Sequence, residues 1–193
     1  MTAWWRRALA ATAALAGALA PLAGSPHRRA AAPPAPAPAR IAELAQIVSD
    51  RDDHVSAAEL AGWLRAGRPR VRVLDLRSAS EFDAYHIPGA EHVPLDRLAT
   101  TPLASDETIV LYSQTGVHAG QAWVLLRLLG HHQVVFLAGG LHEWLDDVMH
   151  PTLPADAGPD TRAAFARTAE LSRWFGGTPA TLDAAPARRY RGC

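Results

Sequence analysis

The stretch IVLYSQTGVHAGQAWVLLRLLG, residues 109–130, contains the strongest fold signal in this chain. It opens with four apolar residues, Ile109 to Tyr112, whose β-branched and aromatic side chains suit a buried parallel strand. A small polar loop from Ser113 to His118 follows, and then an apolar, helix-forming run from Ala119 to Leu129. This order places the loop N–H groups at a helix N-terminus, where the helix dipole favours an anion. The loop is therefore expected to form a small electropositive cradle around Ser113.

Further motifs lie on both sides of this stretch. Upstream they read Asp75-Leu76-Arg77, Glu81-Phe82 and His86-Ile87-Pro88-Gly89-Ala90, and downstream they read Gly130, Val134 to Leu137, Gly139-Gly140 and Trp144. Together with the loop, this series resembles the rhodanese-like domains, which have the sulfurtransferase fold. The resemblance covers residues 54–148 and implies an α/β fold, a rhodanese-like parallel sheet with helices on both faces.

The residues themselves favour the same architecture, because predicted strands alternate with predicted helices. Four strands are expected, whereas the resemblance implies five; the four lie at residues 71–76, 92–94, 109–112 and 134–137. Two capping boxes, Ser56–Glu59 and Ser78–Glu81, mark helix starts, and these helices are expected to end at Gly67 and near Tyr85. Further helical segments are expected at residues 41–48, 95–99, 119–129 and 140–148.

The first residue of the loop departs from the family pattern. Rhodanese-like domains carry a cysteine there, then two residues, a glycine, one residue and often an arginine; here Ser113, Gly116 and His118 occupy those three positions. In the family, the cysteine accepts sulfane sulfur as a persulfide and passes it to a thiophile. A cysteine thiol has a pKa of about 8.5, which a helix N-terminus lowers further. A serine hydroxyl is a far poorer nucleophile without an adjacent base, and it cannot hold a persulfide, so Ser113 is expected to abolish sulfur transfer.

Three interpretations of the loop remain open. In the first, the domain has no catalytic residue, and the loop binds a small oxyanion or a protein partner through Ser113, Gln114, Thr115, Gly116, Val117 and His118. In the second, Ser113 is the nucleophile of a hydrolase, although no base is identifiable and the turn is not the G-x-S-x-G elbow. In the third, the loop is kept only for folding. The first interpretation is favoured because the thiolate is missing.

Other polar residues are candidates for supporting roles. His118 could contact a bound anion or act as a base towards Ser113, and a simple surface position is the alternative. Asp75 and Arg77 are expected to form a structural polar pair beneath the loop side of the sheet, and His86 matches a family position near the structural motifs. No cofactor is expected, and no metal site either, because no ligand set with defined spacing occurs among His131, His132 and His142.

Composition excludes several classes of function. The 193 residues include 19 basic and 19 acidic ones, so the formal net charge of zero gives no electrostatic case for binding nucleic acid. The single cysteine, Cys193, is the last residue and excludes an internal disulfide or a cysteine-based metal site.

The N-terminal part predicts export or anchoring. Residues 1–24 combine a basic start with an uncharged, Ala- and Leu-dominated run from Ala8 to Ala23, which indicates a signal peptide or a membrane anchor. Its 16 residues are fewer than the roughly 20 that a spanning helix needs. Residues 25–45 include an alternating Pro/Ala spacer that predicts an extended linker. The protein is therefore expected to be exported, periplasmic or membrane-anchored, with membrane contact possible through the N-terminal segment.

The C-terminal part, residues 149–193, is predicted to hold a helix and a basic tail. An amphipathic helix is expected over residues 161–175, stopped by Gly176-Gly177. It is expected to pack back on the domain, and an apolar face offered to a partner is the alternative. The tail thiol of Cys193 could replace the missing loop cysteine, although nothing in the sequence places it near Ser113.

The sequence thus predicts a rhodanese-like protein without sulfurtransferase activity that acts as an anion- or protein-binding module at the cell envelope. The competing class is an enzyme, either a thiosulfate sulfurtransferase that uses Cys193 or a Ser-dependent activity.

Overall fold

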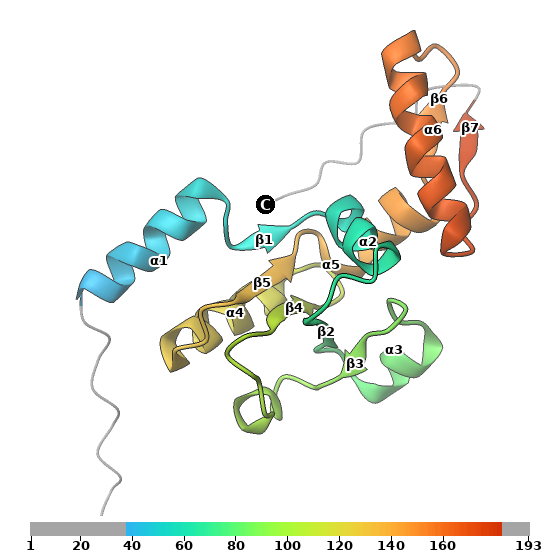
Figure 1. Ribbon diagram of the computed structural model, residues 1–193. Coiled ribbons are helices and arrows are strands. Elements are labelled where there is room, and N and C mark those ends of the chain that lie inside the picture. The colour runs from blue at the N-terminus through green and yellow to red at the C-terminus, as the bar shows by residue number, and fades with distance from the viewer. Residues whose placement is uncertain (1–37, 183–193) are drawn as a thin grey trace, which may run out of the picture. The chain divides into compact units, whose positions relative to one another are not determined.

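A computed structural model describes residues 38–182 of the chain (Figure 1). The predicted leader, the basic tail and Cys193 lie outside the described residues. The elements of the described part are, in chain order, α1 (Pro38–Asp50), β1 (His54–Val55), α2 (Ala57–Arg65), β2 (Val71–Asp75), α3 (Ala79–Ala84), β3 (Glu91–His92), the 3₁₀ turn η1 (Leu98–Thr100), β4 (Thr108–Tyr112), α4 (Val117–Leu129), β5 (Val134–Leu137), α5 (Gly140–Glu143), the π-helical turn η2 (Trp144–Met149), β6 (Thr152–Pro154), α6 (Pro159–Trp174) and β7 (Ala180–Leu182).

The central sheet has five strands in the order β1-β5-β4-β2-β3, and every pairing is parallel (Figure 1). The α/β fold and the five strands are therefore confirmed. The register of β2 with β4 places Asp75 beside Tyr112, so the two strands end at the same edge of the sheet. The residues that follow these strands, Leu76-Arg77 and the loop from Ser113, meet at this edge.

Alternation along the strands produces two hydrophobic clusters, one on each face of the sheet. Val110 and Tyr112 of β4 belong to the cluster that α2, α5 and η2 cover. Ile109 and Leu111 of the same strand belong to the cluster that contains Trp123 of α4. Because successive side chains of a strand point to opposite faces, a run of four apolar residues is what a strand covered on both sides requires.

The two predicted capping boxes begin α2 and α3. Ser56 Oγ accepts a hydrogen bond from the Glu59 N–H at 3.2 Å, and the Glu59 carboxylate accepts from the Ser56 N–H at 3.0 Å. In α3 the Glu81 carboxylate accepts from the Ser78 N–H, also at 3.0 Å. Each box satisfies N–H groups that the first turn of a helix leaves without intrahelical acceptors.

Several boundaries differ from the sequence prediction. The fifth strand, β1, is only two residues long and was not among the four predicted. Helix α4 begins at Val117 rather than at Ala119, because Gly116 adopts a left-handed conformation and acts as the N-cap. The helix expected over residues 140–148 is α-helical only to Glu143 and continues as the π-helical turn η2. The strand at 92–94 and the helical turn at 95–99 are shifted, to β3 and η1.

Helix α1 is longer than the helix predicted at residues 41–48, so residues 38–45, assigned to the linker, are helical. Leu44 and Ile47 pack against the cluster around Trp123, and Glu43 pairs with Arg127 of α4 at 3.3 Å. Among residues 38–182 no helix is both long and apolar enough to cross a membrane.

The predicted C-terminal helix is α6, and two short strands that were not predicted flank it. These strands, β6 and β7, pair in parallel as a separate sheet. The Phe175 ring meets the buried Trp144 ring edge-on, with centroids 5.0 Å apart, and Leu171 packs against the same cluster. The expectation that this helix packs back on the domain is thus confirmed.

Candidate functional site

Ser113 is the first residue after β4 and is buried, with only 3% of its surface exposed. Its hydroxyl oxygen accepts a hydrogen bond from the Ala119 N–H in the first turn of α4, at 3.4 Å. This contact is the only side-chain hydrogen bond that Ser113 makes within residues 38–182. No described histidine therefore lies within hydrogen-bond distance to act as a base towards Ser113, although serine nucleophiles need one.

Two backbone hydrogen bonds from α5 hold the main chain of the loop. The Leu141 N–H donates to the Ser113 carbonyl at 2.9 Å, and the His142 N–H donates to the Gln114 carbonyl at 3.1 Å. The Val117 and His118 N–H groups begin α4 and, as at every helix N-terminus, have no acceptor within their own helix. The loop therefore directs its carbonyls towards α5 while the N-terminal amides of α4 remain at the loop.

Two glycines allow the backbone of α5 to lie this close to the backbone of the loop. Gly116 has a φ of 87° and Gly140 a φ of 60°, a region that side chains disfavour. A Cβ atom on Gly140 would overlap the Ser113 carbonyl oxygen and lie 2.6 Å from the Gly116 nitrogen. A Cβ atom on Gly116 would lie 3.2 Å from both the Gly139 nitrogen and the Leu137 oxygen. The glycine pair after β5, Gly139-Gly140, thus belongs to the site. From the sequence alone it was only one of the motifs that resemble the family.

A buried ion pair lies beside the loop, as expected. The Arg77 guanidinium donates to both carboxylate oxygens of Asp75, with a shortest distance of 2.6 Å, and Asp75 is fully buried. Burial opposes the charge of Arg77, but the hydrogen bonds and the charge of Asp75 outweigh it and raise the pKa of the guanidinium. Arg77 also donates to the Tyr85 carbonyl at 2.7 Å and to Gln114 Oε1 at 3.3 Å. The ion pair is therefore joined directly to the second residue of the loop.

Tyr112 connects the same network to the turn at Ile87. Its hydroxyl oxygen accepts a hydrogen bond from the Ile87 N–H at 3.2 Å. Burial, a hydrogen bond with Asp75 and the charge of Asp75 raise the pKa of the Tyr112 phenol far above its ordinary value of 10.0. The hydroxyl group therefore stays protonated and serves as a structural hydrogen-bonding group.

The remaining predicted residues are less tightly held. Thr115, Val117 and His118 are exposed, and the structure shows no side-chain hydrogen bond for them within residues 38–182. The contacts of the His86 side chain are with Phe82: its ring stacks on the Phe82 ring with centroids 3.9 Å apart, and its Nδ1 is 3.0 Å from the Phe82 carbonyl oxygen. Within residues 38–182 no group of three or more His, Cys, Asp or Glu side chains is arranged to hold a metal ion.

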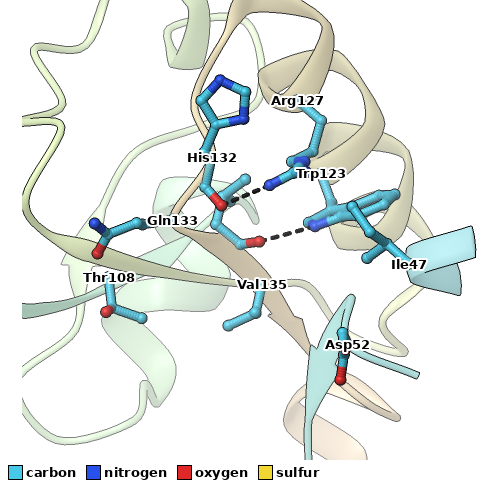
Figure 2. Close-up of a pocket in the computed structure, with 9 residues that line it drawn as sticks. Ile47, Asp52, Thr108, Trp123, Arg127, His132, Gln133 and Val135 are labelled. Carbon is cyan, nitrogen blue, oxygen red and sulfur yellow. Dashed lines mark hydrogen bonds between the residues drawn. The ribbon is translucent and has the colours of Figure 1, made fainter. Parts of the chain in front are cut away.

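A cavity of about 320 Å³ lies elsewhere, beside the start of β5 (Figure 2). Its lining includes Thr108, the first residue of β4, and Trp123, whose indole N–H donates to the Val134 carbonyl at 2.8 Å. Arg127 lines it as well and donates to the His132 carbonyl. Because the loop follows the carboxyl end of β4, this cavity is at the opposite end of the sheet and is not part of the candidate site.

The parallel sheet with helices on both faces is the α/β arrangement expected of a rhodanese-like domain. The rhodanese-like domain family matches residues 56–147. Human thiosulfate:glutathione sulfurtransferase is 34% identical over 108 residues, which cover 48% of this chain and 92% of that protein. The chain belongs to the rhodanese-like domain family.

Other similar proteins differ in length. The probable adenylyltransferase/sulfurtransferase MoeZ of Mycobacterium tuberculosis is 33% identical over 94 residues, and the chain spans only 24% of its length. Among solved structures, the human single-domain sulfurtransferase TSTD1 has 33% identity and a TM-score of 0.44, over 48% of this chain and 95% of that one.

Proposed function

We propose that this protein is a rhodanese-like domain that does not transfer sulfur and that binds a small oxyanion at the loop formed by residues 113–118. The observation that carries the proposal is Ser113, which occupies the nucleophile position of the family and is buried against the start of α4. Sulfur transfer needs a polarizable group that is anionic near neutral pH, and a hydroxyl does not meet this requirement. Relatives named as sulfurtransferases indicate which reaction the scaffold would support with a thiol at this position.

Oxyanion binding is favoured over a serine-dependent reaction by the local contacts. The Ser113 oxygen accepts from the Ala119 N–H and has no base beside it among the described residues. The loop nevertheless keeps the feature that suits an anion, the N-terminal amides of a 13-residue helix. A thiosulfate or sulfate ion has the size and the acceptor oxygens to match such donors. A protein partner that presents a carboxylate or phosphate would use the same groups.

We also propose that the protein acts at the cell envelope. The predicted leader in residues 1–24 and the Pro/Ala spacer after it support a domain held at the cell envelope, with the leader as signal peptide or anchor. Fractionation of cells that produce the full chain, with detection of its N-terminus by mass spectrometry, tests this. A chain found only in the soluble cytosolic fraction with an intact leader contradicts it.

The activity test compares the full chain with Ser113→Cys and Cys193→Ser in a thiosulfate:cyanide assay. We expect no activity in the wild type and measurable activity in Ser113→Cys, because the variant restores the thiol at the loop. Wild-type activity that disappears in Cys193→Ser would make the tail thiol the catalytic group. Wild-type activity that persists in Cys193→Ser would contradict the proposal that the domain does not transfer sulfur.

The binding test is calorimetric titration of the full chain with thiosulfate and with sulfate. We expect an affinity that is lost in Gly116→Val, since that side chain would press on the backbone of Leu137 and Gly139. Gly62→Val is the matched control, because a Cβ atom on Gly62 meets nothing within 4 Å. A wild-type protein that binds neither anion contradicts the proposal.

A further inference from the structure

Arg77 has a fixed orientation beneath the loop. Its side chain is only 6% exposed, and its guanidinium group donates to the Asp75 carboxylate and to the Tyr85 carbonyl. The remaining terminal nitrogen donates to Gln114 Oε1 at 3.3 Å. These contacts come from three different segments of the chain, so the guanidinium plane cannot turn away from Gln114 without breaking buried hydrogen bonds.

This contact determines which end of the Gln114 amide lies beside Arg77. A guanidinium group has five N–H donors and no acceptor, so the atom of Gln114 beside Arg77 has to be the oxygen. The amide nitrogen, Nε2, is then turned away from Arg77. Within residues 38–182 the structure gives this nitrogen no protein acceptor, and the Gln114 side chain is partly exposed. The two N–H donors of this amide thus have no acceptor among the described residues.

The charge of Arg77 is not itself available to a ligand. Asp75 neutralises it in a buried pair, and burial of both groups keeps them together. The family pattern often has an arginine where this chain has His118, which is exposed. The loop therefore contains no fully charged guanidinium within the 113–118 segment, and neutral donors have a larger share in recognising a ligand.

We propose that the Gln114 side-chain amide is a ligand-binding donor, held by Arg77 in the orientation that accepts oxyanions and rejects ligands that offer only donors, such as ammonium groups. The inference rests on the proposed oxyanion binding and adds a specificity-determining residue to it. In this arrangement Gln114 contacts the ligand, while Arg77 is a positioning residue that acts through Gln114.

Two variants of Gln114 separate the roles of its amide. Gln114→Glu keeps an oxygen for Arg77 but has no N–H donor and adds a negative charge. Gln114→Met has a similar length and neither donor nor acceptor. Gln121→Glu is the matched control, because Gln121 is an exposed residue of α4 and adds the same charge without contact to Arg77.

The experiment titrates each full-chain variant with sodium thiosulfate and follows binding by calorimetry, with circular dichroism to verify folding. We expect Gln114→Met to weaken binding about tenfold or more, because the variant loses a hydrogen bond to a charged ligand. Gln114→Glu is expected to abolish measurable binding, and Gln121→Glu to change it by less than about threefold because exposed charges are screened. In the wild type, the ¹⁵N-labelled Gln114 side-chain amide signals should shift as thiosulfate is added.

The outcomes distinguish this inference from the proposed function. A wild type that does not bind thiosulfate overturns both. A wild type that binds, with a folded Gln114→Met variant that binds equally well, overturns only the role of Gln114. Unshifted Gln114 amide signals at saturating thiosulfate lead to the same conclusion, even if neither Gln114 variant folds.

Discussion

The Ser113 carbonyl and the Leu141 N–H are joined by a 2.9 Å hydrogen bond, which ties the loop after β4 to the first turn of α5. Two segments that the chain separates by a whole helix and strand therefore form one structural unit. Substitutions in either segment should affect the other. A substitution of Gly140, which lies against the Ser113 carbonyl, measures how much stability this contact contributes.

Gly140→Ala is expected to destabilise the protein by about 3 kcal/mol or more, because the new Cβ atom would overlap the Ser113 carbonyl oxygen and because φ is 60° there. Gly130→Ala is the control: its φ of 97° is also positive, but its Cβ atom meets nothing within 4 Å, so the expected loss is about 1–2 kcal/mol. Urea denaturation measures both. Equal losses would show that the close approach of α5 to the loop is unimportant for stability.

Asp75→Asn should cost about 3–5 kcal/mol, since it leaves the buried charge of Arg77 without its counter-ion. The exposed Arg65–Glu170 pair provides the comparison, and Glu170→Gln should cost about 1 kcal/mol or less. The free energies of unfolding from denaturant titrations test this contrast. A loss in Asp75→Asn as small as that in Glu170→Gln would contradict a structural role for the buried pair.

Glu59 should contribute a small, pH-dependent stability to α2. The Ser56 N–H and hydroxyl groups lower the pKa of the Glu59 carboxyl below its ordinary value of 4.5. A group whose folded-state pKa is depressed stabilises fully above its unfolded pKa and loses that stabilisation as the pH falls through the folded pKa.

The measurement compares the melting temperature of the wild type with that of Glu59→Gln between pH 7 and pH 3. Glutamine can still accept from the Ser56 N–H, so the variant removes mainly the titrating charge. We expect the wild type to be slightly more stable at pH 7, by less than about 1 kcal/mol, and this advantage to vanish near pH 3. An advantage that grows on acidification would have the wrong sign for a lowered pKa.

Phe175→Ala should weaken the docking of α6 by about 2–3 kcal/mol, because the ring packs edge-on against the buried Trp144. Trp174→Ala removes a larger side chain that is 55% exposed, so its cost should be smaller. Hydrogen exchange of the α6 amides reports the local effect alongside global unfolding. Greater loss of protection in Trp174→Ala would reverse this assignment.

Local signals made much of the fold predictable from the sequence. The run from Ile109 to Leu129 contains its own strand, loop and helix signals, and the two capping boxes depend on residues three apart. Strand β1 was missed because two residues are too few for a periodic pattern, and it exists only through pairing with Phe136 and Leu137 far along the chain. Strands β6 and β7 have three residues each, and their pairing depends on the 16-residue helix between them.

The site shows the same division between local and long-range information. The position of Ser113 and the Asp75–Arg77 pair follow from motifs within a few residues. The contact of Arg77 with Gln114 joins residues 37 positions apart, and the steric need for Gly140 arises from a carbonyl on another segment. No pattern in a single sequence records such contacts, although the Gly139-Gly140 pair after an apolar strand was a visible signal.

The backbone hydrogen bonds from Leu141 and His142 have a consequence for how such proteins diversify. The N–H groups of α5 hold the Ser113 and Gln114 carbonyls, and these two hydrogen bonds do not depend on which side chains residues 113 and 114 carry. A chain of this family can therefore lose or regain its nucleophile through a single codon while its architecture is inherited unchanged. Membership of the family and a shared fold therefore do not by themselves establish turnover, which has to be judged from the residues of the loop.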